Sequence, residues 1–342
     1  MATSRRIQAD RLRDFCTQLF KAVGTPSDIA VVEARILVNS DLKGHLSHGV
    51  FQIPGYIQSI EDKGLIPDGT PEIVRQTAST AFVDSKLCWG HYAGEWCMNL
   101  AIEKARTTGM GSVSITNSHH IGRLGEYAEQ AAAAGFASLL VTGGKSAGGA
   151  SPFGGAEGAL GTNPIAFGFP SADGRHFVSD FATTAIAGAK IHIARIKGTE
   201  LPPGSIIDKH GHPSVDPEDF FAGGRLLVFG GYKGYAISLV TCLLGGLAGV
   251  VPNSGDVGGT YFQAIDIGAF QPLEDYQSAV QSFMNDFRAI PPAPGFSEVM
   301  VPGDPERNKE AEQLREGIDL PEKICQELLE YAEKYSVTAT LG

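Results

Sequence analysis

The chain has few cysteines, no long apolar run and a shortage of positive charge. Its five cysteines form no C-x-x-C pair, which predicts reduced thiols in a cytoplasmic protein rather than a disulfide framework. We find no run of ~18 apolar residues that would span a membrane and no apolar signal-peptide core. The 27 Lys and Arg against 38 Asp and Glu give a net charge of −11. This balance disfavours nucleic acids and anionic membranes as partners, so we expect a small-molecule substrate held by a local cationic site.

Three common nucleotide-binding and metal-site motifs are also missing. The sequence contains no G-x-G-x-x-G, G-x-x-x-x-G-K-[ST] or H-E-x-x-H. The Gly-Lys-Ser at 144–146 resembles the end of a P-loop, but Leu139 stands where that motif needs its first glycine. These absences exclude an ordinary Rossmann or P-loop site, so any nucleotide site must be built differently.

Hydrophobic residues make up 43% of the 342 residues, enough for a large core and about two domains. Apolar periodicity and capping signals predict helices near both chain ends, at 8–23, 25–39, 51–63, 305–317 and 321–335. The middle predicts strands at 73–83, 112–116, 137–142, 164–169, 176–180 and 261–268, and helices at 92–107, 124–134, 184–197, 235–247 and 274–288, with mostly loop at 198–231 and a linker at 290–295. The expected architecture is α/β, with domains of 1–72 plus 290–342 and of 73–289.

The first polar cluster lies in residues 41–49. His45 and His48 are three residues apart, a spacing compatible with zinc on a helix, whereas Gly44 and Gly49 favour a loop. Three interpretations stay open: a metal site, a proton-transfer dyad and an inert loop. In the dyad, Ser47 orients His48, which acts as the acid or base.

The stretch 112–125 is the most informative part of the chain. A predicted strand ends at polar residues, two histidines follow, and a helix begins near Leu124. Helix N-termini suit anions such as phosphate, and His120 adds a group that moves protons near neutral pH. Arg123 is unfavourable for the helix dipole at this position, so we expect it to face an anion. The plainer interpretation is a helix cap with one solvated histidine.

Three further clusters have two interpretations each. The segments 161–166 and 179–184, with Lys190 on the following helix, form either a helix cap or a wall of a ligand cleft. The Gly-rich turn around Lys233 is either a phosphate clamp or a flexible turn. Arg307 and Lys309 form either a solvated face or a contact to a 2′-phosphate, which favours NADP over NAD.

Together these motifs resemble the type 2 malate/lactate dehydrogenases, a family that includes sulfolactate and ureidoglycolate dehydrogenases, diketogulonate reductase and piperideine-2-carboxylate (ketimine) reductases. The resemblance runs from about Leu12 to Tyr335. It rests on Asp41…Ser47-His48-Gly49…Pro54…Tyr56, Asn117-Ser118…His120…Gly122, Gly161-Thr-Asn-Pro-Ile-Ala, Asp180…Ala-Thr, Asp208…Gly211…Pro213, Gly231-Tyr-Lys-Gly-Tyr and Pro302-Gly-Asp-Pro-Glu.

The resemblance implies a non-Rossmann, nicotinamide-dependent dehydrogenase fold, with a central mixed-sheet domain and a helical domain formed by both chain ends. It also implies a homodimer that binds NADP or NAD between these domains. Ser47 and His48 would supply the proton, with His120 as the second candidate, and Thr162 would face the substrate. The implied cofactor contacts are His120, Ile121, Gly122, Arg123, Leu124, Asp180, Phe181, Ala182, Gly231, Tyr232, Lys233 and the segment 304–310 with Asp304, Arg307 and Lys309.

The implied reaction moves a hydride to a C=O or C=N carbon beside a carboxylate, in a 2-oxo acid or a cyclic or N-alkyl 2-imino acid. Gln52 stands where many family members have an arginine, which replaces charge-assisted bonds to a substrate carboxylate with neutral ones. An uncompensated loss of ~1–3 kcal/mol disfavours dicarboxylates such as malate. Two other classes stay open: a metal-assisted hydrolase or lyase using the histidines, and a noncatalytic dinucleotide-binding protein.

Overall fold

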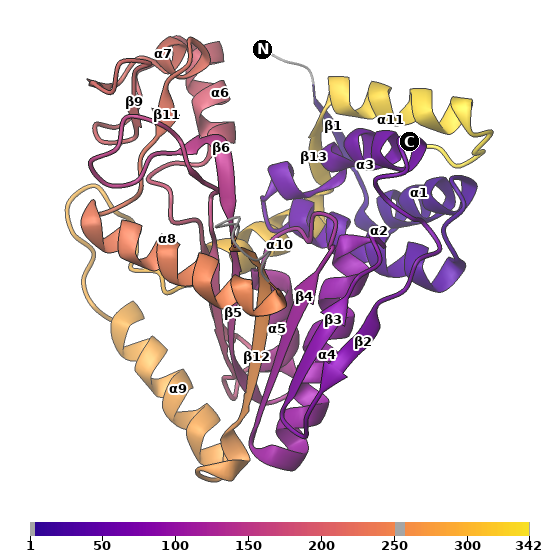
Figure 1. The fold of residues 1–342 in the computed structure, drawn as a ribbon, viewed down its shortest axis with the longest axis vertical. Helices are drawn as coiled ribbons and strands as arrows, with labels where there is room; N and C mark the ends of the chain where they lie inside the picture. Colours follow the sequence, from indigo (N-terminus) through magenta and orange to yellow (C-terminus); the bar gives the residue numbers. More distant parts are fainter. Residues whose placement is uncertain (1–3, 250–256, 342) are drawn as a thin grey trace.

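A computed structural model describes residues 4–249 and 257–341, and a seven-stranded mixed sheet forms its centre (Figure 1). In spatial order the strands are β2 (Glu72–Gln76), β3 (Thr80–Asp84), β4 (Met110–Thr116), β12 (Gly259–Asp266), β5 (Phe136–Gly143), β7 (Ile165–Phe169) and β8 (Phe177–Phe181). The β3–β4 pair is parallel, and the other neighbouring pairs are antiparallel. The expected central mixed sheet is confirmed.

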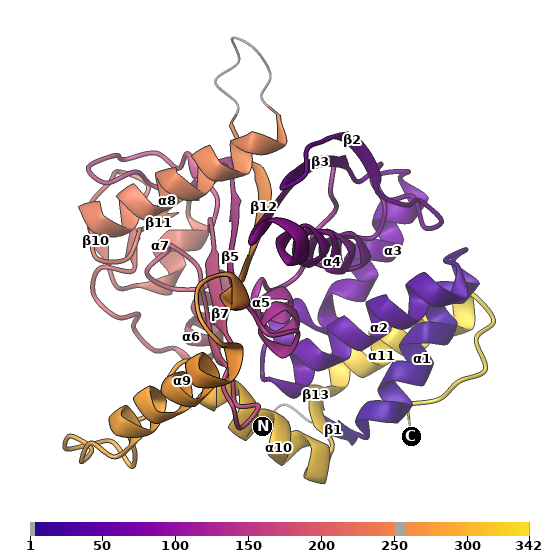
Figure 2. The ribbon, with the colours of Figure 1, turned by 90° about the horizontal axis from the view of Figure 1, so that it is seen from below.

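Helices cover both faces of this sheet (Figure 2). The helices α4 (Gly90–Thr108) and α5 (Gly125–Ala133) pack on one face, and α8 (Tyr232–Gly245) packs on the other. The close approach of β4 to α4 requires a glycine, because a Cβ atom on Gly111 would lie 1.9 Å from the carbonyl oxygen of Ala101. Fully buried Val113, Leu140 and Phe262 fill the layer between the sheet and α4 and α5.

The two chain ends form one helical unit beside the sheet. It contains α1 (Ala9–Ala22), α2 (Ser27–Leu42), α3 (Ile53–Glu61), α10 (Asp304–Glu316) and α11 (Glu322–Lys334). The strands β1 (Ser4–Ile7) and β13 (Ile318–Pro321) pair antiparallel and join the ends, and Leu12 and Leu328 share one core. The predicted fold class is confirmed, while the exact domain limits stay a prediction. Neither four-residue strand was predicted, because they are too short to show a period.

A second, small sheet lies beside α6 (Gly188–Lys197) and α7 (Pro217–Phe221) (Figure 1). Its order is β10 (Pro213–Ser214), β9 (Ile206–Ile207), β11 (Arg225–Leu226) and β6 (Lys145–Ala150). The loop predicted for 198–231 therefore contains short strands and one helix. The helix predicted from Thr184 begins later, since Thr184 forms a β-bridge with Val228.

The rest of the chain connects these units. Helix α9 (Leu273–Arg288) follows β12 through the short helix η4 (Ile267–Ala269), and the predicted linker at 290–295 leads on to α10. None of the helices in the described ranges is both long and apolar enough to cross a membrane. All five cysteines are buried, and none of them forms a disulfide within the described residues.

Candidate functional site

The two histidine clusters of the sequence meet at one place. The first occupies the short helices η1 (Leu46–His48) and η2 (Val50–Gln52) after α2, and the second occupies the loop between β4 and α5. The first loop folds back on Asp41, whose Oδ2 accepts a hydrogen bond from the Val50 amide at 2.9 Å. A Cβ on Gly49 would lie 1.9 Å from Oδ1 of Asp41, so only glycine permits this turn.

The predicted dyad is formed, and it faces a second ring. The Ser47 hydroxyl lies 3.0 Å from Nδ1 of His48, and the Tyr56 hydroxyl lies 2.7 Å from Nδ1 of His120. The two imidazoles stack with centroids 5.7 Å apart and 29° between their planes. A hydroxyl can donate to a neutral imidazole or accept from a protonated one, so it tolerates both charge states. In each ring, Nε2 is the nitrogen left for proton exchange.

Burial makes both rings weak bases. Loss of solvent, with nearby positive charge from His45, His91 and Arg123, lowers the pKa of His48 to about 4. Loss of solvent is also the largest cause at His120, and positive charge from His91, His48 and His119 adds to it, which lowers the pKa of this ring to about 3. Both rings are therefore neutral at pH 7 in the ligand-free protein, which suits removal of a proton from an alcohol. A bound carboxylate would raise both pKa values.

The adjacent histidine points elsewhere. His119 lies with its Nε2 3.0 Å from the Ser59 hydroxyl on α3, and its ring stands edge-on to Tyr56 at 5.3 Å. His119 and His120 thus use different partners on the same helix, because Ser59 is three residues beyond Tyr56. Only His120 faces His48.

Contacts connect several of the predicted cofactor segments with one another and with the first loop. Oδ2 of Asp180 accepts a hydrogen bond from the Gly125 amide at 2.7 Å, so the end of β8 lies against the segment 120–124. The next residue, Phe181, packs edge-on against Phe229 at 5.8 Å, beside the Gly-rich turn. Ala182 follows on the same strand end. The start of α10 approaches the first loop, with Glu306 Oε1 3.5 Å from Nε2 of His45.

The head of α8 is a glycine-rich turn that opens a helix. Gly230 and Gly231 have φ of +58° and +62°, which few other residues adopt. The first backbone bond of this helix runs from the Tyr235 amide to the Gly231 carbonyl, so the amides of 232–234 precede it. Exposed Tyr232 and Lys233 lie at this end. Beside the turn is a cavity of about 660 Å³ lined by Phe153, Ile207, Val228 and other largely apolar residues.

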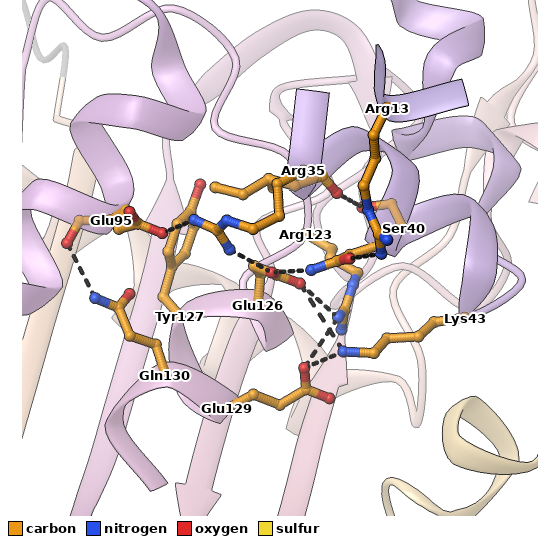
Figure 3. A network of polar contacts seen from close by, with 12 residues as sticks. Arg13, Arg35, Ser40, Lys43, Glu95, Arg123, Glu126, Tyr127, Glu129 and Gln130 are labelled. Atoms are coloured by element: carbon orange, nitrogen blue, oxygen red, sulfur yellow. Dashed lines mark hydrogen bonds and ion pairs between the residues drawn. The ribbon is translucent and has the colours of Figure 1, made fainter. Parts of the chain in front are cut away.

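Arg123 does not face an open anion site. Its guanidinium is buried and pairs with Glu126 at 3.0 Å and Glu129 at 3.3 Å. Lys43, at the end of α2, pairs with the same Glu129, and Arg35 joins from the middle of α2 (Figure 3). This network connects the helical unit to α5. The expectation that the Arg123 side chain meets a ligand is corrected: two carboxylates of its own chain occupy it.

Arg307 and Lys309 also have partners within the chain. Arg307 donates to Asp304 at 2.8 Å and to the His176 carbonyl at 2.7 Å, and Lys309 donates to Glu312 at 3.0 Å. Burial opposes ionisation of Asp304, but bonds from Arg288 and Arg307 outweigh it and hold the pKa of this carboxyl well below its usual range. These contacts within the chain leave the preference for NADP over NAD a prediction.

The three predicted substrate residues lie in different surroundings. Gln52 turns its amide onto the Ser47 carbonyl at 2.6 Å, next to the dyad. The Thr162 carbonyl accepts bonds from the amide and the hydroxyl of Thr183, at 2.8 and 3.0 Å, which fixes its backbone beside β8. Lys190 is exposed on α6, and the described residues show no polar contact between it and the histidines. The structure brings only Gln52 directly to the dyad loop.

Comparisons with known proteins identify the family. Residues 7–329 match the family model described as malate/L-lactate dehydrogenase. The chain belongs to this family. It is 33% identical to malate dehydrogenase of Pyrococcus abyssi, covering 97% of this chain and 95% of that one. It is 35% identical to L-lactate dehydrogenase of Cupriavidus necator, covering 97% and 98%.

Solved structures give the same result. Malate dehydrogenase from Entamoeba histolytica superposes with a TM-score of 0.91 at 27% identity, covering 98% of this chain and 99% of that one. The delta1-piperideine-2-carboxylate reductase from Pseudomonas syringae superposes with a TM-score of 0.84 at 30% identity, covering 96% and 100%. The chain is therefore a dehydrogenase, an oxidoreductase of the kind that acts on 2-hydroxy acids.

Sequence reasoning missed part of this dehydrogenase's site. Tyr56 appeared among the family motifs but was not assigned a role, although its spacing from Ser47 places it one helix further on. Glu33 and His91, which pair beneath His120, gave no sequence signal because 58 positions separate them. In the described ranges no group of three or more His, Cys, Asp or Glu side chains is arranged to hold a metal ion.

Proposed function

We propose that this dehydrogenase transfers a hydride between a nicotinamide dinucleotide and C2 of a 2-oxo acid or of a cyclic or N-alkyl 2-imino acid. The proton passes through the pair formed by His48 and His120. One observation carries the proposal: two stacked imidazoles each have Nδ1 held by a hydroxyl, which leaves Nε2 of each ring for proton exchange with the substrate. A purely structural histidine pair would not need two hydroxyl partners that accept either charge state.

The nicotinamide, when bound, carries the hydride. The side chains of the chain do the rest. Ser47 and Tyr56 set the orientation of the rings, and a neutral Nε2 takes the proton from a substrate hydroxyl as the alcohol is oxidised. In the reverse direction a protonated Nε2 gives a proton to the oxygen or nitrogen.

The choice of substrate rests on Gln52. Its amide already donates to the Ser47 carbonyl, and it brings no charge to a second carboxylate. This favours a monocarboxylate with a neutral, cyclic or aryl side chain over a dicarboxylate. Two relatives support this range of substrates: one is named as an L-lactate dehydrogenase and the other as a delta1-piperideine-2-carboxylate reductase.

Cofactor and assembly complete the proposal. The segments 120–124, 180–182 and 231–233 contact the dinucleotide, with the head of α8 on its phosphates, and either NAD or NADP is compatible with them. A second copy of the chain covers the apolar surface of α8 and of the short helix η3 (Gly246–Ala248) that follows it, where Leu243 and Leu247 are 65% and 59% exposed. Five free thiols suit a reducing compartment such as the cytoplasm.

The test is oxidation of NADPH and of NADH against pyruvate, oxaloacetate, phenylpyruvate, piperideine-2-carboxylate and pyruvate with methylamine, each with and without a chelator. Turnover that survives chelation supports the proposal. Turnover on the imines alone identifies a ketimine reductase, and turnover on oxaloacetate alone contradicts the inference from Gln52. Loss of activity on chelation would favour a metal-assisted reaction, and bound dinucleotide without turnover would favour a noncatalytic binder.

A further inference from the structure

A carboxylate and an imidazole lie buried beneath the two-ring site. Glu33 on α2 and His91 at the start of α4 are both 0% exposed. Glu33 Oε2 lies 2.8 Å from Nδ1 of His91, and Glu33 Oε1 accepts a hydrogen bond from the Tyr92 amide at 2.7 Å. A carboxylate can only accept, so Nδ1 of His91 carries the proton in this bond. Glu33 thus caps α4 and orients His91 at once.

A buried pair of this kind is seldom the most stable choice. Removing two ionisable groups from water costs free energy, and well-packed apolar residues of similar volume often stabilise a fold as well or better. We therefore infer that the Glu33–His91 pair, at the junction of the helical unit and the sheet domain, has a role beyond packing. The neighbours of His91 supply that role.

The ring of His91 supports the segment that carries His120. It stands edge-on to His120 at 6.2 Å and to Tyr56 at 5.8 Å. Gly122, with φ of +70°, passes directly over it, because a Cβ there would lie 2.5 Å from Nε2 of His91. Nε2 is itself buried and has no hydrogen-bond partner among the residues that the structure describes.

The backbone is equally close. A Cβ on Gly90 would lie 2.1 Å from the His120 carbonyl oxygen, so the first turn of α4 touches the site loop without an intervening side chain. Any shift of this turn would move His120 with it. Glu33 fixes the turn from α2, the helix that also leads to the Ser47–His48 loop.

We propose that Glu33 and His91 form a positioning pair that holds His120 and Tyr56 in register with His48 for proton transfer. Neither residue touches the substrate. The proposal rests on the proposed function, since it assigns a purpose to the geometry of that proton-transfer site.

The pair also acts through charge. His91 is the first neighbour, after burial, that lowers the pKa of His120, and it lowers the pKa of His48 and His119 as well. The titratable groups that face His120 are Tyr56 from α3, His48 from η1, His119 from its own loop and His91 from α4, with Glu33 behind His91. Removing the positive charge at His91 should therefore raise the pKa of His120.

Two variants and a control test this in the full-length protein. Glu33→Gln keeps an acceptor for the Tyr92 amide and removes the charge. His91→Asn keeps a donor toward Glu33 and removes the ring beneath Gly122. The control is Thr25→Val, which removes the hydroxyl bonded to Trp89 Nε1 at 3.0 Å at the same junction of α2 with α4 but leaves the histidine rings alone.

The first readout is the titration of His120 followed by NMR of its ring proton, assigned by comparison with His120→Asn. We expect His91→Asn to raise the midpoint by about one pH unit, Glu33→Gln to shift it away from the wild-type value, and Thr25→Val to leave it unchanged. An unchanged midpoint in both variants would overturn the proposal. This measurement needs no turnover, so it separates failure of the pairing from failure of the proposed function.

The second readout is kinetic. With a substrate from the panel, both variants should lower kcat about tenfold, with little change in KM for the dinucleotide, and move the acidic limb of the pH profile in the same direction as the NMR midpoint. A loss of kcat equal to that of Thr25→Val, with the pH profile in place, would reduce the pair to an ordinary structural contact and refute its positioning role.

Discussion

The hydroxyl of Tyr56 lies 2.7 Å from Nδ1 of His120, while the tyrosine ring stands edge-on to Trp89 at 5.9 Å. The same side chain therefore belongs to the core of the helical unit and to the proton-transfer site. Its ring is held by packing, and its hydroxyl sets the orientation of His120. These two roles can be separated by removing one atom.

Tyr56→Phe removes that atom and keeps the ring. We expect kcat to fall by roughly 10–100-fold, with a small change in KM, because His120 loses the bond that orients it. Stability should fall by only about 1 kcal/mol. Steady-state kinetics with the best substrate of the panel, beside a urea unfolding curve, checks both parts. Wild-type kcat in this variant would contradict the role of Tyr56.

Gln52→Arg tests the basis of substrate choice. An arginine beside Ser47 offers two charge-assisted bonds to a second carboxylate, so kcat/KM for oxaloacetate relative to pyruvate should rise by about tenfold or more. Gln52→Leu, which offers no hydrogen bond, is the control and should not produce the rise. If the ratio stays at the wild-type value in Gln52→Arg, another residue grips the substrate carboxylate.

Glu126→Ala breaks the buried network of Figure 3. Glu126 bonds to Arg123 at 3.0 Å and to Asn39 at 2.9 Å, and its loss leaves the buried guanidinium with a single carboxylate. The variant should lose about 3–5 kcal/mol of stability in urea unfolding. The exposed pair of Glu316 with Arg6 supplies the control, since Glu316→Ala should hardly move the midpoint.

Asp41 predicts how stability depends on pH. Burial raises the pKa of this carboxyl to about 8, well above the value of about 4 expected in the unfolded chain. The folded protein binds the extra proton, so Asp41 lowers stability as pH rises from about 4 to about 8. Between about pH 6.5 and 8, where His48 and His120 are already neutral, Asp41→Asn should flatten this decline in denaturant unfolding. An unchanged slope would show that Asp41 is ionised in the folded protein.

The sequence predicts the elements of this fold that have a periodic apolar pattern or a short local motif. Helices such as α1 and α11 have apolar residues at helical spacing over their whole length. The dyad is also local, because Ser47 and His48 are adjacent in the sequence. Short elements are different: β1 and β13 exist because they pair with each other across 310 or more positions. No local pattern encodes such a partner.

Side-chain pairing escapes prediction for the same reason. Arg123 looks like an anion ligand in the sequence, but Glu129 on the next helix and Lys43 on α2 turn it into part of a buried network. Neither Glu33 nor His91 belongs to a recognisable sequence motif. They form a pair because the fold brings α2 against α4. The resemblance to the family suggested roles for site residues that local sequence patterns left open. The hydrogen-bond and ion-pair partners of these residues were visible only in the fold.

The central claim is that one ring of the stacked pair exchanges the proton. The most direct measurement compares kcat of His48→Asn, His120→Asn and the neighbouring control His119→Asn, with dinucleotide binding followed by fluorescence in each. We predict a loss of about 10²–10⁴-fold in at least one variant of the pair, with the dinucleotide still bound, and a change of only a few fold in the control. Near-wild-type kcat in both His48→Asn and His120→Asn would contradict the account.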